Sequence, residues 1–250
     1  MNRLRTKATV DSRKVLDRLG DMFGLIGGFH TRDAHSPLRT KDEHCNLIRM
    51  SAHVLTRHSH TARPALPVLG DMALPLARLH EICGPARRSL AMRVAAATRG
   101  PVIWIAPTWL SDRANPDGML PLVDPGRFIF VSPQRPEDLL WSLEEVLRSG
   151  QVPLAVADLP EPPPLTPVRR LHLAAETGAA DGAFAPLGLI LTPGDGGAPG
   201  VETRWHMAPA HSAHHNGWQL ERRRARTAPP AAWHLSETNG QWQMAPPHRD

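Results

Sequence analysis

Prolines interrupt this chain so often that it cannot be built from long helices. There are 26 prolines among 250 residues, about twice the usual share of roughly 5%. A proline inside a helix removes a hydrogen bond and clashes with the preceding turn. Because 41% of the residues are hydrophobic, the chain can still bury a core in one large domain with tails. We therefore expect short elements joined by frequent loops.

From residue 74 to residue 191, short apolar runs alternate with amphipathic stretches, and proline and glycine separate them. This alternation is typical of βαβ units and a parallel sheet. The helix expected over 136–148 has the clearest ends, because Pro136 suits its first turn and Gly150 suits its C-cap. Strands are expected over 78–83, 102–106, 128–132, 154–157 and 187–191, and further helices over 86–98 and 168–177.

The last third of the chain changes character. Residues 203–207 and 218–224 alternate apolar and polar side chains, as antiparallel strands with one buried face do. Segments 233–235 and 241–243 flank Asn239-Gly240, a strong hairpin signal. The predicted fold is therefore α/β: a mostly parallel twisted sheet flanked by helices over residues 71–243, with antiparallel strands at its C-terminal edge. Residues 244–250 are expected to fray.

Residues 1–70 read as a basic, poorly ordered N-terminal arm. The first 63 residues carry 12 basic and six acidic side chains, and only 11–19 and 47–55 suggest short helices. Met50 or Met72 is an alternative start of the protein. Cys45 and six histidines of this arm raise the alternative of a metal site, but their spacing fits no helical ligand pair or zinc finger. A solvated tail fits the pattern better.

The cysteine content and the hydropathy pattern indicate in which cellular compartment the protein is expected. The two cysteines, Cys45 and Cys83, have no paired spacing, which argues against a disulfide scaffold and a structural zinc site. We expect a cytoplasmic protein in a reducing environment. The sequence has no run of about 18 apolar residues and no recognisable signal peptide, so we expect neither membrane insertion nor secretion.

The most informative stretch is LHEICGPARRS at residues 79–89. A strand that ends in glycine and runs straight into a helix is where a phosphate-binding loop lies. This stretch resembles the first strand and nucleotide loop of RecA-like recombinases, and residues 124–158 resemble a later strand, helix and strand of that core. More narrowly, residues 74–243 resemble the ImuA family, RecA-related accessory proteins of a bacterial mutagenesis cassette. The residues that carry this narrower resemblance are Trp104-Ile105, Leu140-Trp141, Glu144-Glu145, Arg169-Arg170-Leu171, Ala174-Ala175-Glu176 and Thr203-Arg204-Trp205.

The nucleotide loop is degenerate. A phosphate loop needs a second glycine, a lysine and a hydroxyl at fixed positions, and no second glycine or lysine follows Gly84 at that spacing. Residues 106–108 are Ala-Pro-Thr where RecA-like ATPases place a catalytic glutamate. Asp158 does stand at the Walker B position, but alone it cannot run phosphoryl transfer. We therefore predict no catalytic residues and no cofactor, with at most weak binding of ATP and magnesium. The degenerate site comprises Gly84, Arg87, Arg88, Ser89 and Asp158.

Arg87 and Arg88 pose a separate question, because cations at a helix N-terminus oppose the helix dipole. One interpretation is a retained anion site for a phosphate, a nucleotide or a partner's carboxylate. The other is a pair of solvated arginines on an exposed turn. Both remain open at this point.

The densest positive run comprises Arg222, Arg223, Arg224 and Arg226. On a strand, Arg222 and Arg224 share one face and Arg223 lies on the other. Together with nearby tryptophans, the run could contact single-stranded DNA or a partner by stacking and charge. The alternative is that the tryptophans are core residues and the arginines pair with glutamates. The tryptophans concerned are Trp205, Trp218 and Trp233, and the glutamates are Glu202, Glu221 and Glu237.

Other catalytic patterns find little support. No serine lies in a nucleophile elbow, and 14 scattered histidines make chance neighbours common. A weak metal site is an alternative for the histidines near residue 210, although a His-rich loop fits them better. These histidines are His206, His211, His214 and His215.

The ImuA resemblance implies a non-catalytic accessory protein in SOS-induced translesion DNA synthesis and DNA repair. The partners it implies are RecA and an ImuB-like polymerase relative, and through the latter the error-prone polymerase and the sliding clamp. One alternative is a divergent DNA-dependent ATPase or recombinase modulator that uses Arg87 or Arg88 in place of the lysine and Asp158 for magnesium. Another is a cell-division inhibitor of the same superfamily, directed at a tubulin-like polymer.

Overall fold

The structure is a computed structural model that describes residues 63–110, 112–212, 216–238 and 241–247. The folded unit begins at Arg63. The helices predicted over 11–19 and 47–55 lie outside the described residues, as do the histidines and the cysteine of the arm. His214 and His215 also lie outside them.

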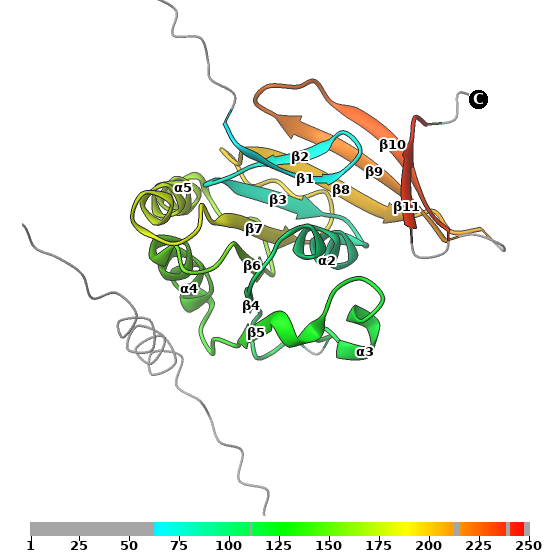
Figure 1. The fold of residues 1–250 in the computed structure, drawn as a ribbon. Coiled ribbons are helices and arrows are strands. Elements are labelled where there is room, and N and C mark those ends of the chain that lie inside the picture. Colours follow the sequence, from blue (N-terminus) through cyan, green and yellow to red (C-terminus); the bar gives the residue numbers. More distant parts are fainter. Residues whose placement is uncertain (1–62, 111, 213–215, 239–240, 248–250) are drawn as a thin grey trace, which may run out of the picture. The chain divides into compact units, whose positions relative to one another are not determined.

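A mixed sheet of nine strands forms the centre of the folded unit (Figure 1). The strand order is β11-β10-β9-β8-β3-β7-β6-β4-β5. The six strands from β8 to β5 run parallel, and β9, β10 and β11 extend the sheet in antiparallel fashion. The predicted α/β fold is thus confirmed. The strands are β3 (Leu79–Cys83), β4 (Val102–Ile105), β5 (Phe128–Val131), β6 (Leu154–Asp158), β7 (Leu187–Thr192), β8 (Thr203–Pro209), β9 (Asn216–Ala225), β10 (Ala231–Thr238) and β11 (Gln241–Ala245).

Helices cover both faces of the parallel strands. Along β7, Leu187, Leu189 and Leu191 belong to the core that includes α2, whereas Gly188 faces Leu147 of α4. Two α-helices, α4 and α5, therefore lie on the face opposite α2. No helix in the part of the chain that the structure describes is long and apolar enough to cross a membrane. The helices are α2 (Arg87–Ala97), α3 (Pro116–Met119), α4 (Pro136–Ser149) and α5 (Leu165–Asp181), with a 3-10 turn at Pro125–Arg127.

Local sequence explains how two of these helices begin and end. Gly150 ends α4 in a left-handed conformation with φ 59°, as the sequence predicted. The helix α5 begins at Leu165 rather than at residue 168. Pro167 falls in its first turn, where the missing N–H has no helical partner to lose. A proline that suggested a loop is therefore part of the helix start.

A hairpin precedes the main sheet and corrects the predicted boundary of the arm. Strands β1 (Ala65–Leu69) and β2 (Met72–Pro75) pair antiparallel, and Met72 and Leu74 are fully buried. Residues up to 70 were expected to be poorly ordered, because Pro67 and Pro75 lie in these two strands and proline in an apolar run argues against a strand. At the other end, β11 extends to Ala245, so fraying does not begin at residue 244. The side chain of Met244 lies against Gly70 of the hairpin.

Helices α4 and α5 touch through their backbones. A Cβ atom added to Gly178 would lie 2.0 Å from the carbonyl oxygen of Leu147, and one added to Gly150 would lie 2.1 Å from the carbonyl oxygen of Gly178. Glu144 joins the same helices because it accepts a hydrogen bond from Arg148 of α4 and forms an ion pair with Arg170 of α5 at 2.6 Å. The helices can come this close only because glycine occupies the contact.

We expect Gly178→Ala to lower the free energy of unfolding by about 1 to 3 kcal/mol, because a methyl group must push two backbones apart. The expected loss is the net effect that remains after the gain of about 1 kcal/mol in helix propensity. The matched control is Gly118→Ala in α3, where an added Cβ meets nothing within 4 Å, and it should be neutral or stabilising. Urea denaturation of both variants measures the difference. Equal stabilisation by both would contradict the close contact.

Candidate functional site

The turn after β3 is closed by its own chain. The N–H of Gly84 donates to Gly194 O at 2.9 Å, that of Ala86 to Met207 O at 3.0 Å, and that of Arg87 to Gly84 O at 3.2 Å. Gly84 has φ +92°, and a Cβ atom there would lie 2.5 Å from Met207 O. In a phosphate loop these amides would face the ligand. Here they are hydrogen-bonded to carbonyl groups of the protein.

Two arginines at the start of α2 reach Asp158, which ends β6 and is 3% exposed. The Nε of Arg88 donates to Asp158 Oδ2 at 2.6 Å, and the Nε of Arg87 lies 3.7 Å from Oδ1. Arg88 also donates to Asp112, whose side chain is exposed. Burial lowers the pKa of Arg88, but its hydrogen bonds to Asp158 and Asp112 outweigh this, so its pKa is raised overall. Arg88 is a permanent cation between two carboxylates.

The structure thus brings together Gly84, Arg87, Arg88 and Asp158, as the sequence predicted, while Ser89 lies in the first turn of α2. The arginine side chains are only 21% and 22% exposed and both face Asp158. The interpretation as solvated arginines is therefore wrong. The first turn of α2 carries no acidic residue, and Asp158 supplies the negative charge there instead. The Arg88 guanidinium thus occupies Oδ2 of this carboxylate.

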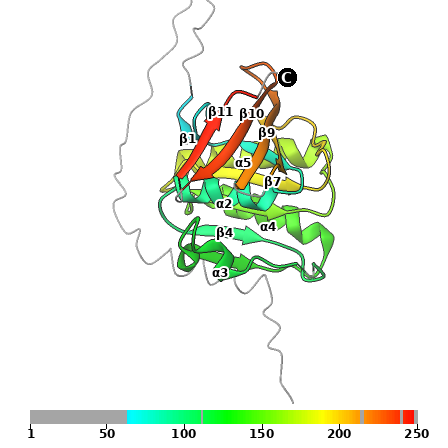
Figure 2. The same cartoon turned by 90° about the vertical axis from the view of Figure 1, so that its right-hand side faces the viewer.

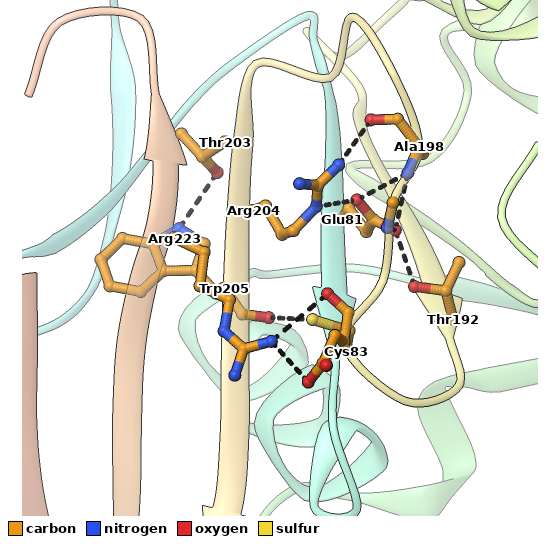
Figure 3. Close-up of polar contacts among 10 residues, drawn as sticks. Glu81, Cys83, Thr192, Ala198, Thr203, Arg204, Trp205 and Arg223 are labelled. Carbon is orange, nitrogen blue, oxygen red and sulfur yellow. Dashed lines mark hydrogen bonds and ion pairs between the residues drawn. The ribbon is translucent and has the colours of Figure 1, made fainter. Parts of the chain in front are cut away.

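A second polar cluster lies in the middle of β3, around the fully buried Glu81 (Figure 3). Its Oε1 accepts hydrogen bonds from Thr192 Oγ1 at 2.8 Å and from the N–H of Gly197 at 2.9 Å. Its Oε2 accepts from Arg204 Nε at 2.5 Å. The N–H of Ala198 contacts both oxygens, and Arg204 donates in turn to Ala198 O. Every partner of this carboxylate comes from β7, β8 or the loop between them.

Glu81 therefore holds the crossover from β7 to β8, residues 193–202, against the sheet. This connection has no helix, and four of its glycines have positive φ, so its backbone needs other anchors. Sequence reasoning missed this cluster. The available signal was a single acidic residue inside an otherwise buried strand, together with Arg204 in a strand of alternating pattern.

Cys83, at the end of β3, lies in an environment that keeps its thiol protonated. Its thiol is buried and lies 3.5 Å from Trp205 O. Burial, with a further contribution from the charge of Glu81, raises the pKa of Cys83 to about 12. A thiol with this pKa is almost fully protonated near neutral pH.

The histidines near residue 210 do not form a metal centre among the described residues. The ring of His206 would touch a Cβ atom at Gly84, and burial followed by the charge of Arg223 lowers the pKa of His206. His211 accepts a hydrogen bond from the N–H of Gly217 and packs edge-on against Trp218. In the part of the chain described here, no three His, Cys, Asp or Glu side chains are arranged to hold a metal ion.

The arginine run on β9 is largely engaged within the protein. A bulge places Trp205 opposite Arg222 and Arg204 opposite Arg224, so Arg223 is the extra residue. The guanidinium of Arg222 lies over Trp205 and Trp233, with its carbon 5.7 and 5.1 Å from the ring centres. On the other face, Arg223 forms ion pairs with Asp195 at 2.7 Å and Glu221 at 2.9 Å.

The other arginines of the run and the nearby tryptophans show whether this segment is free to contact DNA or is engaged within the protein. Arg226 lies 3.3 Å from Glu202, and Arg224 is exposed. Trp205 and Trp218 are buried, at 1% and 8% exposure. Trp205 and Trp218 are thus core residues, whereas Trp233 is only partly buried against that core. Glu202 and Glu221 pair with arginines of the run, so the alternative is confirmed for these residues and stays a prediction for Glu237. The faces of Trp205 and Trp218 are not available for stacking on a base. Figure 2 shows β9, which carries Trp218 and Arg224, beside β10 and β11.

Comparison with known proteins adds no relative to this picture. No family model and no curated protein matches the chain. The site is therefore interpreted from its geometry: a glycine turn closed by its own backbone, an aspartate neutralised by arginine, and a buried carboxylate that anchors a loop.

Proposed function

We propose that this protein is a non-catalytic accessory protein that acts by protein-protein contact in SOS-induced translesion DNA synthesis. The ion pair between Arg88 and Asp158 is the observation that carries the non-catalytic part of this proposal. The identity of the process and of the partners, RecA and an ImuB-like polymerase relative, rests on the sequence resemblance over residues 74–243.

The ion pair supports this function because phosphoryl transfer needs metal ions and a cationic side chain that contact the phosphates. Here the carboxylate in the metal-binding position already has a cation at 2.6 Å. Removing one partner of such a buried pair costs several kcal/mol. The closed amides of Gly84, Ala86 and Arg87 add a second cost, since nucleotide binding would have to break their hydrogen bonds.

Exposed apolar side chains support the contact function. Strand β5 is the outermost strand at the parallel end of the sheet (Figure 1), so one of its edges has no partner strand in the described fold. Ile129 and Phe130 on this strand are 38% and 48% exposed. An exposed edge strand with apolar side chains is a template for pairing with another chain. We therefore place the partner contact at β5.

The test is a pull-down of the full chain with RecA and with an ImuB-like protein, with and without single-stranded DNA and ATP. An ATPase assay on the same samples should show no turnover. Phe130→Ser should reduce capture, whereas Leu173→Ser, at an exposed leucine of α5, should not.

Two results would overturn this proposal. Turnover that is abolished by Asp158→Asn would favour the divergent ATPase instead. Failure to capture either protein, together with inhibition of a tubulin-like polymer, would favour a cell-division inhibitor.

A further inference from the structure

Arg93 of α2 differs from the other arginines that are buried or half-buried in the described fold. Each of the others forms an ion pair with an acidic side chain or donates to a backbone carbonyl group, as Arg127 and Arg222 do. Arg93 does neither within the part of the chain that the structure describes, and its Nε atom is buried without an acceptor.

A second buried donor without an acceptor lies beside it. The guanidinium carbon of Arg93 is 5.3 Å from the ring centre of Trp242 on β11. The indole Nε1 of Trp242 is also buried and has no acceptor among the described residues. Buried donors without acceptors destabilise a fold and are rare in native proteins. Two of them on adjoining side chains mark a place where an acceptor from another molecule would be stabilised.

The charge of Arg93 is not neutralised by a contacting carboxylate. Burial lowers the pKa of Arg93, and the negative charge of Glu237 on β10 offsets only part of this. No acidic side chain of the described residues forms an ion pair with Arg93. Arginine stays protonated in proteins, so this guanidinium is a cation with reduced hydration. A carboxylate matches it, because its two oxygens can accept from both donors and its charge is opposite.

The surroundings of Arg93 favour a protein partner over a nucleic acid. Trp242 stacks on Trp218 of β9, with ring centres 4.2 Å apart, so Arg93 lies against aromatic side chains rather than among other cations. Nucleic acids are bound by several cations along the backbone, whereas tryptophan and arginine carry much of the binding energy in protein interfaces. The strand β11 is outermost at the antiparallel end of the sheet (Figure 2), so this place lies at the rim of the fold.

We propose that Arg93 and Trp242 form a binding site for a carboxylate side chain of a partner protein, in a segment where the acidic residue is flanked by apolar ones. The site lies at the opposite end of the sheet from β5. It goes beyond the proposed function, because it adds a second contact surface and states the chemistry of the group that binds there.

The test titrates the full chain with a fluorescently labelled peptide of alternating leucine and glutamate, and with the same peptide carrying glutamine in place of glutamate. Fluorescence anisotropy gives the affinity, and NMR follows the Nε–H signal of Arg93 and the indole N–H signal of Trp242. The variants Arg93→Lys and Trp242→Phe assign these signals, because each removes one of them. We expect the glutamate peptide to shift both signals and the glutamine peptide to shift neither.

Variants then separate binding from folding. Arg93→Gln should weaken binding of the glutamate peptide by about tenfold or more, because the carboxylate loses a charged donor. The matched control is Arg99→Gln, at an exposed arginine just after α2, and it should leave the affinity unchanged. Arg93→Met should abolish binding and raise the urea midpoint of the free protein, because it removes a partly buried cation that has no partner in the described fold.

Four results would overturn the assignment: no binding of the glutamate peptide, equal affinity for both peptides, an equal loss in Arg93→Gln and Arg99→Gln, or a lower urea midpoint in Arg93→Met. Tighter binding of a labelled oligothymidine than of the glutamate peptide, lost in Arg93→Gln, would also overturn it, in favour of a nucleic acid. The peptide titration uses neither RecA nor an ImuB-like protein. A failed pull-down would therefore contradict the proposed function and leave this site in place.

Discussion

Replacing Glu81 by glutamine is expected to lower the free energy of unfolding by about 3 to 5 kcal/mol, the usual cost of breaking a buried ion pair. The amide group cannot accept hydrogen bonds at both of its ends, so either Arg204 or the N–H groups of the loop lose an acceptor. Arg204 would remain charged, with a side chain only 18% exposed. Urea denaturation followed by circular dichroism measures this loss. Proteolysis within residues 193–202 should become faster, because Glu81 anchors that loop.

Two further variants show whether the effect comes from the ion pair. Glu145→Gln on α4 removes a carboxylate that is 40% exposed and 3.6 Å from Arg148, and its effect should stay within about 0.5 kcal/mol. The double variant Glu81→Gln with Arg204→Met should lose less stability than the sum of the two single variants. A loss below about 1 kcal/mol for Glu81→Gln would contradict the anchoring role.

Acid is expected to destabilise the fold through His80. This side chain is fully buried, with Nδ1 2.8 Å from Thr203 Oγ1 and Nε2 2.9 Å from Pro75 O. The carbonyl can only accept, so Nε2 carries the proton and Nδ1 accepts from the Thr203 hydroxyl. Trp205 Nε1 donates to the same Thr203 oxygen at 3.0 Å. Burial lowers the pKa of His80 from 6.5 to about 4, and the hydrogen bond to Pro75 offsets only part of this.

The sign of the pH dependence follows from that shift. Between pH 6.5 and 4 the unfolded chain binds a proton on His80 that the folded protein does not, so stability falls as the pH falls. Above pH 6.5, the shifted pKa of His80 contributes about 3 kcal/mol to the free energy of unfolding. This contribution is lost as the pH falls from 6.5 to 4. Burial lowers the pKa of His172 and His206 as well, and these groups act in the same direction.

The measurement is the free energy of unfolding at several pH values from 4 to 7. Its slope should flatten in His80→Gln, which has no titrating group at this position and keeps a donor for Pro75 O. The matched control, Leu173→Ser on α5, removes no titrating group and should keep the slope of the unmodified protein. A slope that is the same in all three proteins would contradict the assignment to His80.

Most elements of the folded unit could be predicted because their signals are local. Apolar runs of strand length marked the parallel strands β3 to β7, and Pro136 and Gly150 marked both ends of α4. The strand β8 was expected to be antiparallel, but it pairs parallel with β3 and antiparallel with β9. The hairpin β1–β2 was missed because Pro67 and Pro75 lie in its strands, and a proline within an apolar run argues against a strand. The start of α5 was misplaced because Pro167 suits a loop and a first helical turn equally well.

The candidate site was only partly predictable, because sequence shows which residues lie near each other in the chain but not in space. Asp158 was found from its place at the end of a strand, and Arg88 from its place at the start of a helix. Their pairing joins residues 70 positions apart. Glu81 and Arg204 are 123 positions apart, and no local pattern links them. Likewise, the partner of Arg223 on the loop, Asp195, lies 28 positions away.

The pairing of Arg88 with Asp158 also bears on how such a protein can be controlled. Because Arg88 belongs to the same chain as Asp158, it stays beside this carboxylate whatever ions or nucleotides the solvent contains. We therefore expect the folded unit to keep one shape whether the cell is rich in ATP or in ADP. Any timing of its action would then come from how much of the protein is made and which partners are present.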